Sequence, residues 1–226
     1  MRKATVSRET SETKINLHLN LDETTNHSRH PGLDPGSLAM HPCEIAGQAR
    51  NDENRNDEGQ LAINTGVGFF DHMLNLFAFR AGITLEVSCQ GDLHIDDHHT
   101  IEDIGIALGK AFHEAIGDKK GITRYGNATI PMDESLASCD LDISGRGFLV
   151  FNAQMPMQQI GNFSTEMTAE FFRAFALQAG ITLHINLQYG KNTHHIIEAI
   201  FKATGAALGQ AIKQTGSQIP STKGLL

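Results

Sequence analysis

The chain contains one sequence unit twice, and this duplication constrains its fold more than any other feature. Residues 81–86 (AGITLE) match residues 179–184 (AGITLH). A Phe-Phe pair precedes each copy, and a His-His-x-x-Glu pattern and an Ala-Leu-Gly-x-Ala segment follow each copy in the same order. A chain built in this way predicts two copies of one structural unit, related by a pseudo-two-fold axis.

Each copy predicts a helix, a glycine turn, a strand, a loop and a second helix. Apolar and polar residues alternate over 84–89 and 182–187, which is typical of a half-buried strand. Apolar residues recur at helical spacing over 101–108 and 197–208.

Further strands are predicted before each unit, over residues 14–21 and 137–153. The fold class is therefore α+β, with duplicated sheet-plus-two-helix halves. This arrangement resembles the ribosomal protein S5 domain 2-like or ferredoxin-like repeat folds. We expect a single catalytic domain whose halves are about 1–120 and 121–226.

The doubled pattern predicts metal binding. In His98-His99-x-x-Glu102 and His194-His195-x-x-Glu198, the first His and the Glu are four residues apart and share a helix face. The second His is rotated by roughly 100° and points elsewhere. One copy alone would be weak evidence, because a helical His–Glu pair is usually a solvated surface pair. Two copies in equivalent positions favour a two-metal site.

The duplication also relates His72 to Glu170, since each lies ten residues before the glycine of its copy, Gly82 or Gly180. If His72 is a ligand, Glu170 is one by pseudo-symmetry. The eight candidates then form two sets, of which one is His98, Glu102, Glu170 and His195, and the other is His72, His99, His194 and Glu198. Histidine and carboxylate ligands suit Mn²⁺, and ligand type alone does not distinguish it from Zn²⁺ or Fe²⁺.

A second group of residues has the chemistry of a phosphate site. Guanidinium, ammonium and hydroxyl groups beside glycines suit a phosphate, although each alone is more often a surface group. The candidates are Arg124, Arg146, Lys202, Ser221, Thr222 and Lys223. The tail that carries the last three could equally be disordered.

Charge and composition exclude other classes of protein. A net charge of −8 argues against nucleic acid as a partner, and no apolar run is long enough to cross a membrane. The N-terminus has no secretory pattern, and the three cysteines have no disulfide or metal spacing. We expect a cytoplasmic protein.

Residues 26–58 interrupt the duplicated pattern. They are rich in turn-forming and charged residues without periodicity, and their sequence looks like a translated mobile repeat. They predict an inserted, disordered loop, which a surface connection tolerates at little entropic cost. The alternative is a lid over a substrate.

The motifs together resemble the imidazoleglycerol-phosphate dehydratase family of histidine biosynthesis. The matching segments are TGVGFFDHML at 65–74, DDHHTIEDI at 96–104, SGR at 144–146, HHIIEAIFKA at 194–203 and PSTKG at 220–224. Residues 7–10 resemble the opening strand motif, which carries a Glu that contacts the substrate. The resemblance covers the chain apart from the insert.

The resemblance implies a lyase that dehydrates imidazole glycerol phosphate to imidazole acetol phosphate, with two Mn²⁺ ions per active site, between subunits of a 24-subunit shell. Carried over to this sequence, it makes Glu9 the substrate-contacting carboxylate. It assigns binding of the substrate's phosphate to the candidate phosphate-site residues named above. We hypothesise that Glu9 moves the protons while the metals hold the substrate's ring as an imidazolate.

The sequence departs from the family in two places and leaves two rival functions open. Many members have His at the position of Glu170, and the family often has Ala-Arg-His where this chain has Ala78-Phe79-Arg80. A dinuclear-metal phosphatase would use similar ligands with closely spaced metals. A non-catalytic metal-binding shell protein would not need the basic group.

Overall fold

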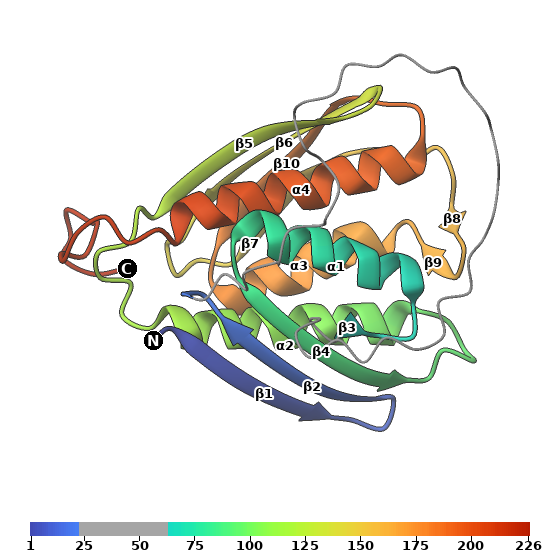
Figure 1. Cartoon of the computed structure of the whole chain (residues 1–226), viewed down its shortest axis with the longest axis horizontal. Coiled ribbons are helices and arrows are strands. Elements are labelled where there is room, and N and C mark those ends of the chain that lie inside the picture. Colours follow the sequence, from blue (N-terminus) through green and yellow to red (C-terminus); the bar gives the residue numbers. More distant parts are fainter. Residues whose placement is uncertain (23–62) are drawn as a thin grey trace, which may run out of the picture. The chain divides into compact units, whose positions relative to one another are not determined.

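The computed structural model describes residues 1–22 and 63–226, and its two halves have the same order of elements (Figure 1). The first half comprises β1 (Lys3–Glu9), β2 (Thr13–Asn20), β3 (Ile63–Asn64), α1 (Gly68–Ala81), β4 (Thr84–Gly91) and α2 (His98–Ile116). The second comprises β5 (Tyr125–Met132), β6 (Ser135–Asp142), β7 (Phe148–Asn152), the short β8 (Gln159–Ile160) and β9 (Phe163–Ser164), α3 (Met167–Ala179), β10 (Thr182–Tyr189) and α4 (Thr193–Ala211). The predicted inserted loop at 26–58 lies outside the described residues.

The two main sheets have matching topology. Their strand orders are β1-β2-β4-β3 and β5-β6-β10-β7, and the small β8–β9 pair stands apart from both. In each main sheet the first three strands are antiparallel and the last is parallel to its neighbour. This identity of order and direction confirms the predicted duplication.

The strands that were predicted are the ones with a buried face. In β2, Ile15 lies opposite Cys89 and Leu17 opposite Val87, and all four side chains are buried. The edge strands β1 and β5 were not predicted from the alternation of apolar and polar residues, because few of their side chains are buried: in β1 only Ala4 is. The strands predicted over 137–153 are β6 and β7, which are separated by a turn.

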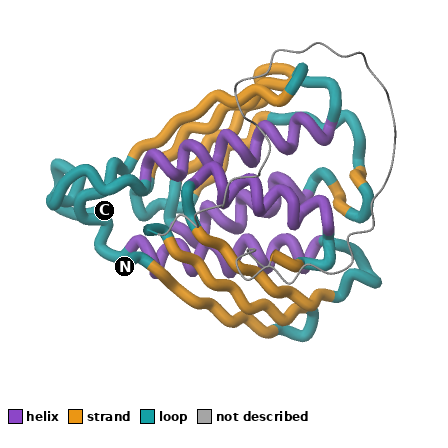
Figure 2. The backbone as a smooth tube through the Cα atoms, in the orientation of Figure 1, coloured by secondary structure: helices purple, strands orange, loops and turns teal. Residues whose placement is uncertain are grey.

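The four helices lie between the two sheets (Figures 1 and 2). Helix α2 packs on β1 and β2, α4 packs on β5 and β6, and the halves meet through the pairs α1–α4 and α2–α3. Two glycines allow these pairs to approach closely. A Cβ on Gly109 would lie 2.7 Å from the Phe175 carbonyl oxygen, and one on Gly205 would lie 2.5 Å from that of Phe77. These two contacts are equivalent in the duplication.

Phenylalanine fills the space between the helices. Phe70 meets Phe171 edge to face at 5.1 Å between ring centroids, and Phe171 stacks on Phe201 at 5.5 Å. The chain has no tryptophan, so phenylalanine provides its largest apolar rings. The core therefore holds the helices in register across the two halves. No described helix is both long and apolar enough to span a membrane.

Candidate metal centre and anion pocket

Three predicted ligands meet where α1 and α4 begin. His72 comes from the start of α1, and His194 and Glu198 come from the first two turns of α4. Their ligand atoms all lie within 4.8 Å of one another, with His194 Nε2 3.2 Å and His72 Nε2 3.9 Å from Glu198 Oε2. Within residues 1–22 and 63–226, no other group of three His, Cys, Asp or Glu side chains meets this criterion.

Glu198 is the buried member of this cluster. Its side chain is 9% exposed, and its other carboxylate oxygen pairs with Lys202. Burial alone would raise the pKa of Glu198, but Lys202, His72 and His194 outweigh it and hold that pKa below its ordinary value. Glu198 is therefore an anion at neutral pH, which is the form that binds a metal.

The second histidine of this motif, His195, does not belong to the cluster. Asn192 caps α4 by accepting hydrogen bonds from the backbone N–H groups of His194 and His195. The His195 Nδ1 atom lies 2.7 Å from Glu134 Oε2, and its Nε2 atom lies 3.6 Å from Asp133 Oδ2. The hydrogen bond with Glu134 raises the pKa of His195.

The first copy of the motif is arranged in a similar way. His98 Nε2 lies 3.6 Å from Glu102 Oε2 on the same helix face. His99 turns away, with Nδ1 2.9 Å from Asp92 Oδ2, and this hydrogen bond raises the pKa of His99. The predicted ligand Glu170 lies in the first turn of α3 and pairs with Arg173 of the same helix.

The acidic residues nearest to the first motif in the sequence bind backbone groups or other side chains rather than its imidazoles. Asp96 and Asp97 accept hydrogen bonds from backbone N–H groups, and Asp103 accepts them from the side chains of Arg8 and Thr13. The partners in this structure are Asp92 and Glu134, which sequence reasoning missed. The position of Asp92 immediately after a strand was the one signal available.

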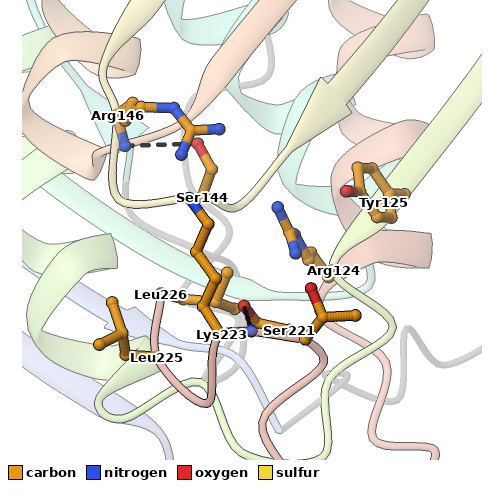
Figure 3. Close-up of a pocket in the computed structure, with 9 residues that line it drawn as sticks. Arg124, Tyr125, Ser144, Arg146, Ser221, Lys223, Leu225 and Leu226 are labelled. Atoms are coloured by element: carbon orange, nitrogen blue, oxygen red, sulfur yellow. Dashed lines mark hydrogen bonds between the residues drawn. The ribbon is translucent and has the colours of Figure 1, made fainter.

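Five of the six predicted phosphate residues line one cavity of about 370 Å³ (Figure 3). They are Arg124, Arg146, Ser221, Thr222 and Lys223, and the lining is completed by Tyr125, Ser144, Leu225 and Leu226. The guanidinium groups and the Lys223 side chain lie round the same space. The sixth, Lys202, is not part of this lining and pairs with Glu198 at the metal cluster.

Arg124 organises the pocket. Its backbone is in the left-handed region, with φ of 75°, a conformation that costs a non-glycine residue energy and is often found at functional sites. Its guanidinium binds both oxygens of Asp142 at 2.7 and 3.1 Å and donates to the Pro220 carbonyl at 2.9 Å. It thereby ties the tail to the sheet. Arg124 and Arg146 both pair with Asp142, and the lining includes a third cation, Lys223, so the pocket favours an anion.

The pocket and the metal cluster lie at opposite ends of α4. The Arg124 N–H donates to the carbonyl of Ala211, the last residue of α4, whereas Glu198 lies near its start. Thirteen residues separate Glu198 from Ala211, which is roughly 20 Å along a helix. One small ligand cannot reach both places within one chain.

Two glutamates near the first hairpin differ in their surroundings. Glu9 ends β1, is 72% exposed at its side chain, and lies 3.9 Å from Lys14. Glu12 lies in the turn before β2, and its Oε1 is 3.9 Å from His99 Nε2. The buried Thr13 hydroxyl, bonded to Asp103 of α2, holds this turn beside the metal-ligand motif.

A His–Glu cluster near the start of α4 and a cationic pocket at its end are typical of one class of protein, the metal-dependent enzymes that act on small phosphorylated substrates. Comparison with known proteins specifies the class further. The profile of the family "imidazoleglycerol-phosphate dehydratase" matches residues 65–208. The enzyme of that name from Oceanobacillus iheyensis is 47% identical over 100% of this chain and 100% of its own. The one from Lactococcus lactis subsp. cremoris is 49% identical over 100% of this chain and 98% of its own.

Solved structures agree with this comparison. Imidazoleglycerol-phosphate dehydratase from Staphylococcus aureus is 40% identical, with a TM-score of 0.71, over 94% of this chain and 99% of that one. The Pyrococcus furiosus enzyme in complex with (S)-C348 is 30% identical, with a TM-score of 0.72, over 98% of this chain and 100% of that one. The chain belongs to the imidazoleglycerol-phosphate dehydratase family, which are hydro-lyases of histidine biosynthesis.

Proposed function

We propose that this chain removes water from imidazole glycerol phosphate to form imidazole acetol phosphate, with two Mn²⁺ ions per active site. The observation that carries the proposal is the convergence of His72, His194 and Glu198 from two helices. One ion bound at these residues and one at the second predicted ligand set would supply Lewis-acid chemistry and orient the substrate. A dinuclear phosphatase is not favoured, because the relatives that match this chain are dehydratases.

The donor atoms fit such an ion. Imidazole nitrogens and carboxylate oxygens suit Mn²⁺ among the divalent metals. We assign one site to His72, His99, His194 and Glu198, and the other to His98, Glu102, Glu170 and His195. The equivalent packing at Gly109 and Gly205 supports Glu170, because it sets α3 beside α2 as α1 is set beside α4.

Both sites need a second copy of the chain. Each set takes the His and Glu of one motif copy and the second His of the other copy, and His99 is not in the cluster that His72, His194 and Glu198 form within one chain. The separation of roughly 20 Å along α4 between the cluster and the anion pocket supports the same conclusion. We propose that active sites form between subunits, in the 24-subunit shell that the family resemblance implies.

The anion pocket would hold the substrate's phosphate. Arg124 and Arg146 offer planar donors to phosphate oxygens, and Lys223 and Ser221 offer an ammonium and a hydroxyl. Lys202, held against Glu198, would meet the substrate from the metal side. The phosphate thus fixes one end of the substrate and leaves its ring to the metal ligands of another copy.

A carboxylate must take the carbon-bound proton and help the hydroxyl leave. Glu9 was predicted for this role from the sequence, and the geometry favours Glu12 in its place. Glu12 faces the Nε2 atom of His99, which is the atom that a metal would bind, whereas Glu9 faces Lys14. We propose Glu12 as the group that moves protons.

The proposal is tested by turnover of metal-free protein titrated with Mn²⁺, with imidazole acetol phosphate as the measured product. Activity that saturates near two ions per chain supports the function and the two sites. Two bound ions without product would exclude this substrate. We place the reaction in the cytoplasm, as expected for amino-acid biosynthesis, and assign it to one catalytic domain built from the halves 1–120 and 121–226.

A further inference from the structure

The two halves place a glutamate at the same position of their first hairpin. In the first sheet Ile15 lies opposite Cys89, and in the second Ala137 lies opposite Leu187. Cys89 and Leu187 are equivalent in the duplication, because residues 81–86 match 179–184. Ile15 therefore corresponds to Ala137, and three residues earlier Glu12 corresponds to Glu134.

These equivalent glutamates make different contacts. Glu134 Oε1 accepts hydrogen bonds from the backbone N–H groups of Asn192 at 2.8 Å and Lys191 at 3.2 Å, and from the Ser135 hydroxyl at 3.1 Å. Its other oxygen, Oε2, lies 2.7 Å from His195 Nδ1. The carboxylate thus has three donors on one oxygen and the imidazole on the other.

This arrangement orients His195. An imidazole whose Nδ1–H donates to a carboxylate keeps its Nε2 lone pair for another partner. The backbone donors come from the loop that caps α4, so the β5–β6 hairpin and the start of the metal-ligand helix are fixed to the same carboxylate. The ring can then be held in place before any metal binds.

In the first half a different residue, Asp92, orients the imidazole of His99. His99 Nδ1 lies 2.9 Å from Asp92 Oδ2, and Asp92, which follows β4, has a side chain only 12% exposed. In the second half β10 ends at Tyr189 and the chain continues as Gly190-Lys191, with no acid in that segment. The hairpin glutamate of the first half, Glu12, is consequently not needed at Nδ1 and lies on the Nε2 side of His99.

We propose that Glu134 is a positioning residue that fixes His195 with its Nδ1–H bound and its Nε2 presented to a metal, and that Asp92 does the same for His99. The inference rests on the proposed function, since it assumes that these two rings bind metal. It also explains why the hairpin glutamate Glu12 is available to a substrate, whereas its counterpart Glu134 is not. Neither Glu134 nor Asp92 is itself a metal ligand in this proposal.

The test measures Mn²⁺ binding by electron paramagnetic resonance of the free ion, on the full-length assembled protein. Glu134→Gln keeps an oxygen for the backbone donors but removes the charge that holds Nδ1–H. It should weaken one of two sites by about 10- to 100-fold and leave the other unchanged. Asp92→Asn should weaken the other site by a similar factor. The control Glu114→Gln, at an exposed position on α2, should bind two ions as the unsubstituted chain does.

The outcomes are distinguishable. If the unsubstituted chain does not bind two ions, the proposed metal function fails and this inference fails with it. If it binds two ions and Glu134→Gln does so with equal affinity, this inference alone is overturned. A purely structural role would lower the melting temperature of the metal-free protein and weaken both sites together, and that result would also overturn the proposal. Glu134→Asp, which restores the charge, should recover part of the lost affinity.

Discussion

Replacing Glu12 or Glu9 by glutamine is the most direct test of the proposed chemistry, because the two substitutions are chemically identical and three residues apart. Among the described residues, the Glu12 carboxylate has His99 as its ion-pair partner, with 3.9 Å between Oε1 and Nε2. The Glu9 carboxylate is exposed and lies 3.9 Å from Lys14. One faces a predicted metal ligand, and the other faces solvent and a surface lysine.

The expected losses differ accordingly. Positioned proton transfer contributes about 10²- to 10⁴-fold to a rate. Glu12→Gln should therefore lower kcat by that factor, equivalent to about 2.7–5.4 kcal/mol of transition-state free energy. Glu9→Gln should change kcat by less than about twofold, since exposed ion pairs contribute little. Both variants should bind two Mn²⁺ ions and melt within a few degrees of the unsubstituted protein.

The assay is the initial rate of imidazole acetol phosphate formation by Mn²⁺-loaded protein at saturating substrate. Metal content and melting temperature are measured on the same preparations, so that loss of metal is not mistaken for loss of chemistry. A kcat that collapses in Glu9→Gln but survives in Glu12→Gln would refute the geometric reasoning and restore Glu9 as the proton-transfer group.

Three further predictions concern packing, the anion pocket and pH. Gly205→Ala would bring a methyl group against a backbone carbonyl of α1 and should lower the free energy of unfolding by about 1–3 kcal/mol, whereas Gly68→Ala, with nothing within 4 Å, should be neutral or stabilising in denaturant melts. Arg146→Ala should weaken inhibition by inorganic phosphate at least about tenfold without changing Mn²⁺ content, as competition kinetics would show. Because carboxylates raise the pKa of His99 and of His195, Mn²⁺ must displace protons from both rings. Its affinity should rise with pH until the rings are neutral and then level off, and calorimetry in two buffers would detect the released protons below that point.

The duplicated architecture was predictable because each feature that indicates it lies within a short stretch of sequence. The glycine turns, the alternating strands and the helical spacing all lie within single copies of the unit, and Gly82 and Gly180 both adopt left-handed φ values of 66° and 67°. The edge strands β1 and β5 were not predictable from alternation. They pair on one side and bury few side chains, so backbone hydrogen bonds rather than an apolar pattern define them.

The site was predictable to the extent that it depends on helix geometry. Spacing of i and i+4 predicted the proximity of His194 and Glu198, and the cluster with His72 contains three of the four members of one predicted set. The carboxylate that holds His195 was not predictable, because Glu134 meets His195 across 61 residues of sequence. No local pattern reports such a contact. Five of the six residues chosen for phosphate-binding chemistry line the anion pocket, and one of them, Arg124, has a left-handed backbone conformation.

The length of α4 has a consequence for mixtures of damaged chains. If the cluster at its start and the pocket at its end serve two different active sites, a chain without His194 still carries an intact anion pocket, and a chain without Arg146 still carries an intact cluster. Co-assembled, the two inactive chains would place some undamaged clusters beside undamaged pockets. Two alleles that each abolish growth without histidine would then restore this growth when expressed together. The activity restored would be proportional to the fraction of interfaces that pair an intact cluster with an intact anion pocket.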